Sequence, residues 1–144
     1  MNYRSTRLTA PIVTSAQAIL NGLAPDGGLY LPLQIPHFDL TYLQALSYPQ
    51  RATHILQAYF DDLDPVALKE GVETAVKRFD TSAIVPVTPC GSQWLLELDH
   101  GPTAAFKDVA LTLLPHLLRI AKAAVHDDSV THILTATSGD MNVW

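Results

Sequence analysis

The chain has 144 residues, of which 48% are hydrophobic, and nine basic against fourteen acidic residues give it a formal net charge of −5. This length suits one ordinary domain, and the scattered basic residues argue against nucleic acid or an acidic membrane surface as a partner. No apolar run is long enough to span a membrane, and residues 1–13 lack the apolar stretch of a secretory signal. The lone Cys90 is expected to be small and buried, and no His and Cys cluster has metal-ligand spacing. We therefore expect no metal and a cytoplasmic location.

The first thirty residues combine a polar opening with a capped helix. Residues 3–7 carry two arginines and, as a chain terminus, are expected to form a solvated arm. Thr14 and Gln17 have the spacing of a capping box and predict a helix that ends before Gly22 or Pro25. Residues 24–28 predict a turn, followed by a strand over 29–32. The glycine pair in that turn is poor evidence for phosphate binding.

The middle of the chain is expected to be a helical lobe. Residues 35–48 form a proline-bounded linker with a short helical piece near 41–46. A helix is predicted over 51–63, and Asp64-Pro65 predicts the N-cap and first residue of the next helix. The lone His37 and His54 are expected to be packing or surface residues.

The last third predicts a βαβ unit. Strands are expected over 84–87 and 94–98 with a turn at Gly91-Ser92, and Gly101-Pro102 marks the next turn. One long helix, capped by Thr103 and kinked at Pro115, is predicted to run to about residue 124. A β-branched strand over 130–136 would follow. The order strand, helix, strand indicates an α/β fold with a right-handed crossover.

Lys107 heads the apolar side of that long helix. Its spacing with Leu111, Leu114 and Leu118 forms a leucine stripe, and the polar stripe runs through Asp108, Thr112, Arg119 and Lys122. Asp108 is therefore expected to face outward or to cap another group. A buried lysine loses its proton more readily and can form a Schiff base with an aldehyde. Alternatively, the lysine stem lies along the leucines and its charge reaches water. Periodicity does not decide between the two.

Two stretches resemble the threonine synthase family. The string Leu-Glu-Leu-Asp-His-Gly-Pro-Thr-Ala-Ala-Phe-Lys-Asp over 96–108 is similar to the lysine motif that holds pyridoxal phosphate (PLP) in that family. Its Gly-Pro-Thr and Phe-Lys-Asp core also resembles other fold-type II PLP enzymes. Residues 18–30 resemble the N-terminal signature of threonine synthases, which those other enzymes lack. Residues 3–7 are similar to their Tyr-x-Ser-Thr-Arg opening, which implies an arm packed against the enzyme body.

The resemblance implies a fold, a cofactor and a reaction. Residues 1–80 would be a helical N-terminal region, and residues 81–144 the first βαβ portion of a tryptophan synthase β-like PLP domain. Lys107 would hold PLP and act as the catalytic base, while Phe106 and Asp108 would position its helix. His100 would stabilise the turn. The implied lyase reaction converts O-phospho-L-homoserine and water to L-threonine and phosphate, in threonine biosynthesis. The substrate would be bound by a loop similar to the family's Ala-Thr-Ser-Gly-Asp-Thr-Gly, comprising Thr137, Ser138, Gly139 and Asp140.

The family pattern continues with Thr-Gly and a small-residue helix, whereas this chain reads Met-Asn-Val-Trp over 141–144 and stops. We therefore expect a truncated N-terminal fragment that is inactive alone, because the glycine-rich loop for the cofactor phosphate would be missing. Two alternatives remain. Another fold-type II lyase, such as a threonine dehydratase, is disfavoured by residues 18–30. A non-catalytic fragment or binding module is favoured by the truncation, and its exposed apolar surface would promote self-association.

Overall fold

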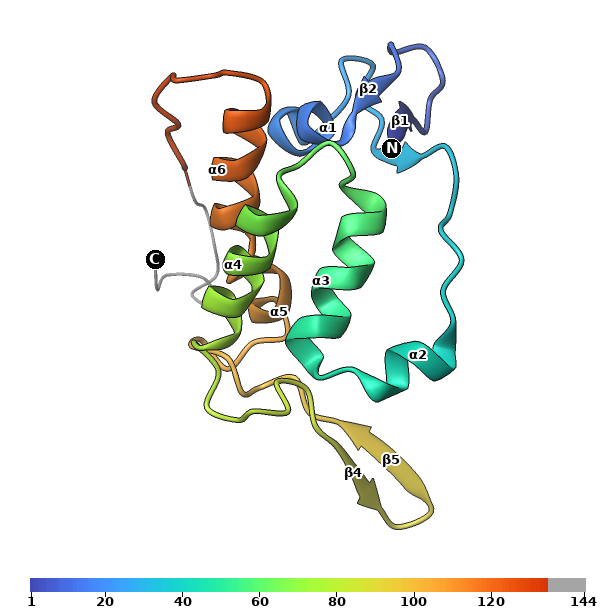
Figure 1. Cartoon of the computed structure of the whole chain (residues 1–144), viewed down its shortest axis with the longest axis vertical. Helices are drawn as coiled ribbons and strands as arrows, with labels where there is room; N and C mark the ends of the chain where they lie inside the picture. Colours follow the sequence, from blue (N-terminus) through green and yellow to red (C-terminus); the bar gives the residue numbers. More distant parts are fainter. Residues whose placement is uncertain (135–144) are drawn as a thin grey trace.

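The structure, a computed structural model, describes residues 1–134. Helices and strands alternate irregularly along this part of the chain (Figure 1). In order they are β1 (Asn2–Ser5), β2 (Val13–Thr14), α1 (Ser15–Asn21), β3 (Tyr30–Pro32), α2 (Leu40–Ala45), α3 (Tyr48–Tyr59), α4 (Pro65–Val76), β4 (Val87–Cys90), β5 (Gln93–Leu96), α5 (Asp108–Leu111) and α6 (Leu114–Ala124). None of these helices is both long and apolar enough to cross a membrane, a statement limited to residues 1–134.

The opening residues form an ordered strand and not a solvated arm. Strand β1 is the centre of a three-stranded antiparallel sheet in the order β2-β1-β3. Tyr3 and Ser5 are buried, and the Tyr3 hydroxyl donates a 2.9 Å hydrogen bond to the carbonyl of Tyr59 in α3. Arg7 donates from Nη1 to the Asp26 carbonyl at 3.1 Å, while Arg4 is exposed. The packed arm implied by the family resemblance is confirmed.

The turn between α1 and β3 is built around its glycines. Gly27 has a φ of 74°, in the left-handed region that glycine adopts without strain. A Cβ at Gly28 would lie 3.0 Å from the Thr6 hydroxyl oxygen and would overlap the Ser5 hydroxyl. The glycine pair therefore allows the turn to lie against β1, and its predicted structural role is confirmed.

Local capping signals predict the starts of α1 and α4 correctly. Thr14 and Gln17 form both halves of the capping box of α1, which ends at Gly22. Asp64 accepts a 2.7 Å hydrogen bond from the Ala67 amide at the start of α4. Helix α3 begins three residues earlier than expected, because Ser47 and Gln50 form another capping box.

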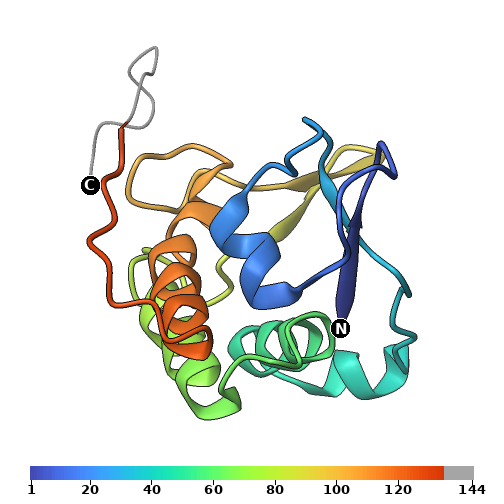
Figure 2. The same ribbon diagram turned by 90° about the horizontal axis from the view of Figure 1, so that it is seen from above.

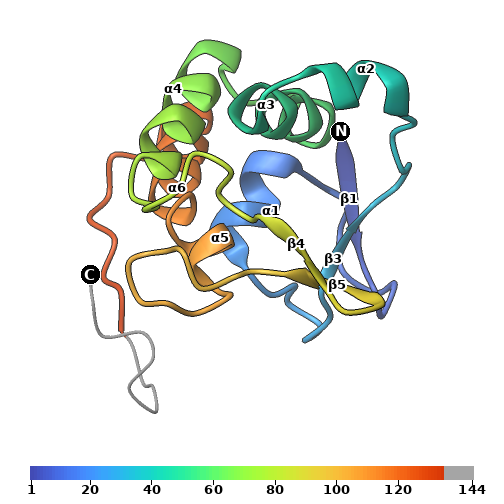
Figure 3. The same cartoon turned by 90° about the horizontal axis from the view of Figure 1, so that it is seen from below.

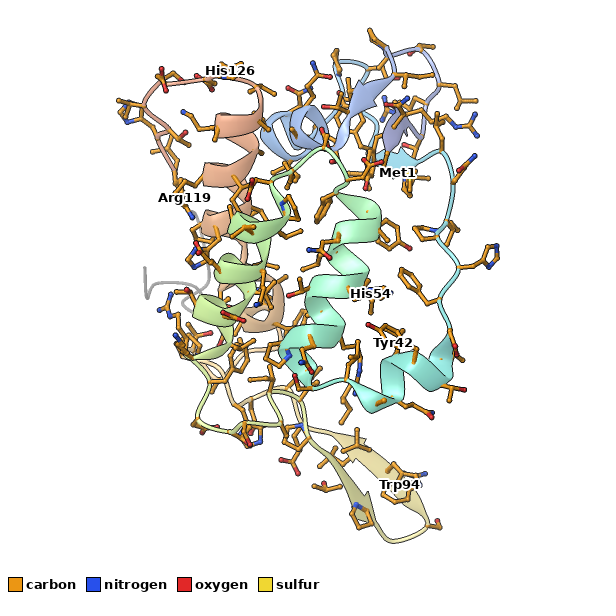
Figure 4. The ribbon with its side chains drawn as sticks, in the orientation of Figure 1. Met1, Tyr42, His54, Trp94, Arg119 and His126 are labelled. Carbon is orange, nitrogen blue, oxygen red and sulfur yellow. The ribbon has the colours of Figure 1, made fainter. Side chains whose placement is uncertain are left out.

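The hydrophobic core lies where α1, α4 and α6 meet. Its buried members are Ala16, Leu63, Leu68, Ile120 and Ala121. The helices α3, α4 and α6 stand side by side, with α1 across one end (Figure 1), and α3 lies between α4 and β1 (Figure 2). His54 packs its ring against Tyr42 at 5.2 Å between centroids (Figure 4), as expected for a packing residue.

Strands β4 and β5 form an antiparallel hairpin that extends away from the helices (Figure 1). The predicted turn at Gly91-Ser92 is confirmed, with Gly91 at a φ of 62°. The first strand begins at Val87, so the strand predicted over 84–87 is wrong in position: Ile84 instead occupies a buried turn with a φ of 63°. Cys90 lies at the hairpin turn and is exposed, so the prediction that it is buried is wrong. None of the described residues covers the tip of the hairpin.

The single long helix predicted over 103–124 is wrong. Residues 103–107 form turns, α5 is one turn long, and α6 starts at Leu114 with Pro115 in its first turn. Proline has no amide hydrogen and cannot bond to the Leu111 carbonyl, so the chain restarts a helix there instead of bending one.

The strand predicted over 130–136 is also not formed where the structure describes it. Residues 130–134 are exposed and irregular, and 135–136 lie outside the described residues. A β-branched run becomes a strand only beside a partner that completes its hydrogen bonds, and none of the described strands pairs with it. The predicted βαβ crossover is therefore not completed within residues 1–134.

Candidate active site around Lys107

Lys107 lies immediately before α5. In the view of Figure 3, α5 lies between α6 and the β4–β5 hairpin. Its carbonyl accepts hydrogen bonds from the amides of Leu111 at 2.9 Å and Ala110 at 3.1 Å. The side chain is half-buried, and Nζ lies 6.0 Å from the centroid of the Phe106 ring. A fully buried amine, one of the two alternatives that the leucine stripe left open, is therefore not observed. Because the long predicted helix is not formed, Lys107 lies at the start of the short helix α5 and not inside a helix.

Asp108 organises the turn that precedes α5. Its carboxylate accepts two hydrogen bonds from Thr103, one from the amide at 2.8 Å and one from the hydroxyl at 2.7 Å. The Asp108 carbonyl accepts from the Thr112 hydroxyl at 2.7 Å. Asp108 and Thr112 are each only 2% exposed. The prediction that the polar stripe of the helix faces outward is therefore wrong for these two residues. Asp108 fulfils the alternative expectation, that it caps another group.

Gly101 makes room for that carboxylate. A Cβ on Gly101 would lie 2.8 Å from Asp108 Cγ and would overlap the side chain. Ala104 adopts a left-handed φ of 54° in the same turn, and its amide donates to the Gly101 carbonyl at 3.1 Å. The Gly-Pro-Thr and Lys-Asp halves of the motif therefore meet in space around one buried side chain.

His100 joins the motif to two other segments. Its ring nitrogens lie 2.7 Å from Asp80 Oδ1 and 2.8 Å from Glu97 Oε2, and Glu97 also accepts from the Thr88 hydroxyl at 2.7 Å. The hydrogen bonds to Glu97 and Asp80 raise the pKa of His100, and the hydrogen bond from His100 lowers the pKa of Glu97. His100 therefore stabilises the turn by linking the hairpin to the loop after α4.

An open hollow of about 440 Å³ lies beside Phe106. Three leucines, two carboxylates, Ala104 and Phe106 line it: Leu95, Leu96, Glu97, Leu98, Asp99, Ala104 and Phe106. Phe106 lines this hollow, and the Lys107 amine lies 6.0 Å from the centroid of its ring. An amine that reacts with an aldehyde fits PLP as its attachment point. The acidic lining of the hollow does not fit the cofactor phosphate, because like charges repel.

The sequence reasoning missed the pairing of Thr103 with Asp108. Thr103 was expected to accept a hydrogen bond as an N-cap, whereas its hydroxyl donates to a carboxylate five residues on. The available signal was Gly101, whose missing side chain marks a close approach. The predicted substrate residues Thr137, Ser138, Gly139 and Asp140 lie outside the described residues and stay predictions.

The sequence profile of the threonine synthase N terminus matches residues 2–76, more than half of the chain. The chain belongs to the threonine synthase family. Over 145 aligned residues it is 38% identical to the threonine synthase of Pseudomonas aeruginosa, a match that covers 97% of this chain and 30% of that protein. This membership agrees with the resemblance of residues 18–30, which disfavours the threonine dehydratase alternative.

Solved structures agree with the family assignment. The PLP-bound threonine synthase of Brucella melitensis superposes with a TM-score of 0.80 at 37% identity, over 88% of this chain and 28% of that one. The yeast threonine synthase gives a TM-score of 0.78 at 32% identity, over 88% and 27%. These matches confirm the mixed α/β fold class of a fold-type II PLP enzyme. The chain spans about 30% of the length of the threonine synthases that it matches.

Proposed function

We propose that this chain is the N-terminal part of a PLP-dependent threonine synthase, and that Lys107 holds the cofactor. The complete enzyme would convert O-phospho-L-homoserine and water to L-threonine and phosphate. The observation that carries the proposal is the placement of Lys107 in a turn organised by Thr103 and Asp108, in a chain of the threonine synthase family. The PLP in the Brucella melitensis relative supports the choice of cofactor.

When bound, PLP supplies an electron sink for the bonds that are broken. We assign to Lys107 Nζ the attachment of the cofactor and the transfer of protons at the substrate carbons. The Phe106 ring lies beside the amine, with its centroid 6.0 Å from Nζ. We further propose that the backbone amides of Ser138 and Gly139 bind the substrate carboxylate, since successive amides can form an anion-binding concavity.

The 144-residue chain by itself is proposed to retain PLP weakly and to form no threonine. Glu97 and Asp99 line the hollow beside Phe106 and leave the cofactor phosphate without a positive partner there. In this proposal residues 1–80 are the N-terminal region and residues 81–144 the start of the catalytic domain. We also propose a cytoplasmic location, which the single cysteine supports.

A second proposal concerns association of the chain with another copy of itself. The hairpin exposes Trp94 (Figure 4), and the motif exposes Phe106. Trp94 is 73% accessible and Phe106 is 65% accessible. An exposed apolar patch beside a two-stranded sheet favours pairing with a second chain. On this view the chain would act as a binding module.

The cofactor proposal is tested by mixing the chain with PLP, reducing with borohydride and mapping the modified lysines by mass spectrometry. We expect Lys107 to be modified in preference to Lys69, whose side chain is 62% exposed and serves as an internal reference. Lys107→Arg should remove that modification and leave Lys69 unchanged. Equal modification of both lysines would reject the proposal. Threonine formed from O-phospho-L-homoserine by the chain alone would reject the proposed inactivity.

A further inference from the structure

Hydrogen bonds to Asp108 hold the short helix α5 in place. Helix α5 has four residues, too few for its own hydrogen bonds to hold it in place. Its first residue, Asp108, is instead fixed from both sides: Thr103 bonds to the carboxylate and Thr112 bonds to the carbonyl. Because Lys107 directly precedes Asp108, these bonds also determine the direction in which the Lys107 stem leaves the backbone.

The buried Asp108 carboxylate needs the two hydrogen-bond donors of Thr103. A carboxylate that is 2% exposed is costly to bury unless hydrogen-bond donors compensate its charge. Thr103 supplies two donors, and hydrogen bonds to an ionised group are stronger than neutral ones. Without the Thr103 hydroxyl, one carboxylate oxygen would lose the hydrogen bond from that hydroxyl, and the turn would lose the arrangement that buries it.

Gly101 restricts the turn to that arrangement. The space that its missing Cβ leaves is filled by the Asp108 side chain. A side chain at residue 101 would push the carboxylate away from Thr103, and residues 101–108 would have to move together. The three residues therefore act as one unit, which we call the 101–108 lock and define as Gly101, Thr103 and Asp108.

We propose that the 101–108 lock is a positioning device that sets the orientation of Lys107 before the cofactor arrives. The inference rests on the proposed function, in which Lys107 holds PLP. Preorganisation of this kind favours reaction because the amine needs no rearrangement to meet the aldehyde. Asp108 and Thr103 act through Lys107 and take no part in the bonds that form or break.

The test compares three variants and a control in the 144-residue chain. Thr103→Val removes only the hydroxyl donor, Thr103→Ser keeps it, and Asp108→Asn keeps the shape but loses the charge. Thr41→Val is the matched control, because Thr41 is an exposed threonine on α2, outside the 101–108 lock. Circular dichroism and the unfolding midpoint establish that each variant is folded.

Two readouts separate the 101–108 lock from the cofactor proposal. The first is PLP modification of Lys107 relative to Lys69 after borohydride reduction. We expect Thr103→Val and Asp108→Asn to lower this ratio about tenfold, as expected for the loss of one hydrogen bond to a charged group, and Thr103→Ser and Thr41→Val to keep it within about twofold. The second readout needs no cofactor: the rate at which acetic anhydride acetylates Lys107 relative to Lys69. Loosening the turn should expose Lys107 and raise that ratio in Thr103→Val and Asp108→Asn only.

Each outcome bears on one of the two proposals. Folded Thr103→Val and Asp108→Asn chains with unchanged acetylation ratios would overturn the positioning role. A wild-type chain in which PLP shows no preference for Lys107, while acetylation still responds to Thr103→Val, would reject the cofactor proposal and leave the 101–108 lock standing. Failure of Thr103→Ser to restore either ratio would also overturn the inference, because the serine hydroxyl can make the same hydrogen bond.

Discussion

The Ser5 hydroxyl donates a 2.6 Å hydrogen bond to the carboxylate of Asp26 and thereby joins the first strand to the glycine turn. The same carboxylate accepts from the Thr9 hydroxyl at 2.9 Å and from the amides of Ala10 and Gly28, each at 3.0 Å. One acidic side chain therefore organises both the loop after β1 and the turn before β3. This explains why an aspartate precedes the glycine pair in the N-terminal signature.

Asp26→Asn should lower the stability of the chain and change its response to acid. The hydrogen bond from Ser5, followed by those from Gly28, Thr9 and Ala10, lowers the pKa of Asp26. A lowered carboxyl pKa stabilises the fold above the unfolded value of about 3.9, and this contribution is lost as the pH falls through the folded pKa. Urea midpoints between pH 3 and pH 7 should therefore fall more steeply with acid in the wild type than in Asp26→Asn. Asp128→Asn, at an exposed site, is the control and should follow the wild type.

His100→Asn should remove a stabilising contribution that depends on pH above neutrality. The pKa of His100 is raised by its hydrogen bonds to Glu97 and Asp80, so its contribution is complete below about 6.5 and is lost as the pH rises through the folded pKa. The wild type should lose stability over that window, and His100→Asn should not. Burial lowers the pKa of His116, so the contribution of His116 makes stability rise with pH. That rise is complete at about pH 6.5, below the window in which His100 acts. An NMR titration of the His100 ring with a midpoint at or below about 6.5 would contradict the prediction.

Gly28→Ala should destabilise the chain by about 1–3 kcal/mol, because the new methyl group overlaps the Ser5 hydroxyl and approaches the Thr6 hydroxyl in a packed turn. Gly22→Ala is the matched comparison, since a Cβ there meets nothing within 4 Å and only the positive φ of 66° opposes it. Its cost should be about 1 kcal/mol. Denaturant unfolding of both variants measures the difference. A smaller loss for Gly28→Ala than for Gly22→Ala would show that the close approach to β1 is not required.

Trp94→Glu should weaken self-association of the chain about tenfold, because it places a charge in the apolar surface of the hairpin. Sedimentation velocity over a concentration series gives the dissociation constant. Leu8→Glu is the control: Leu8 is 67% exposed, and it lies in the loop after β1, outside the hairpin. A monomer at all concentrations, or an equal effect of both substitutions, would argue against the proposed second copy on the hairpin.

Capping and turn signals were reliable because they act within a few residues. Thr14 with Gln17, and Asp64 with Pro65, begin their helices through hydrogen bonds and dihedral preferences that neighbours along the chain supply. The 101–108 motif is likewise a local pattern and can be identified from its residue string. Its internal geometry could not be predicted, because the periodicity implied a continuous helix with Asp108 on its polar stripe.

By itself, the sequence determined the family, the order of the helices in the N-terminal lobe, the glycine turns and the identity of Lys107 as the candidate lysine. Only the tertiary structure decided that Asp108 is buried against Thr103, that Lys107 stands at the start of a one-turn helix, and that residues 130–134 are not a strand. The physical reason is the range of the interactions. A cap or a turn is completed by adjacent residues, whereas burial of a carboxylate and pairing of a strand depend on which distant groups the fold brings beside them.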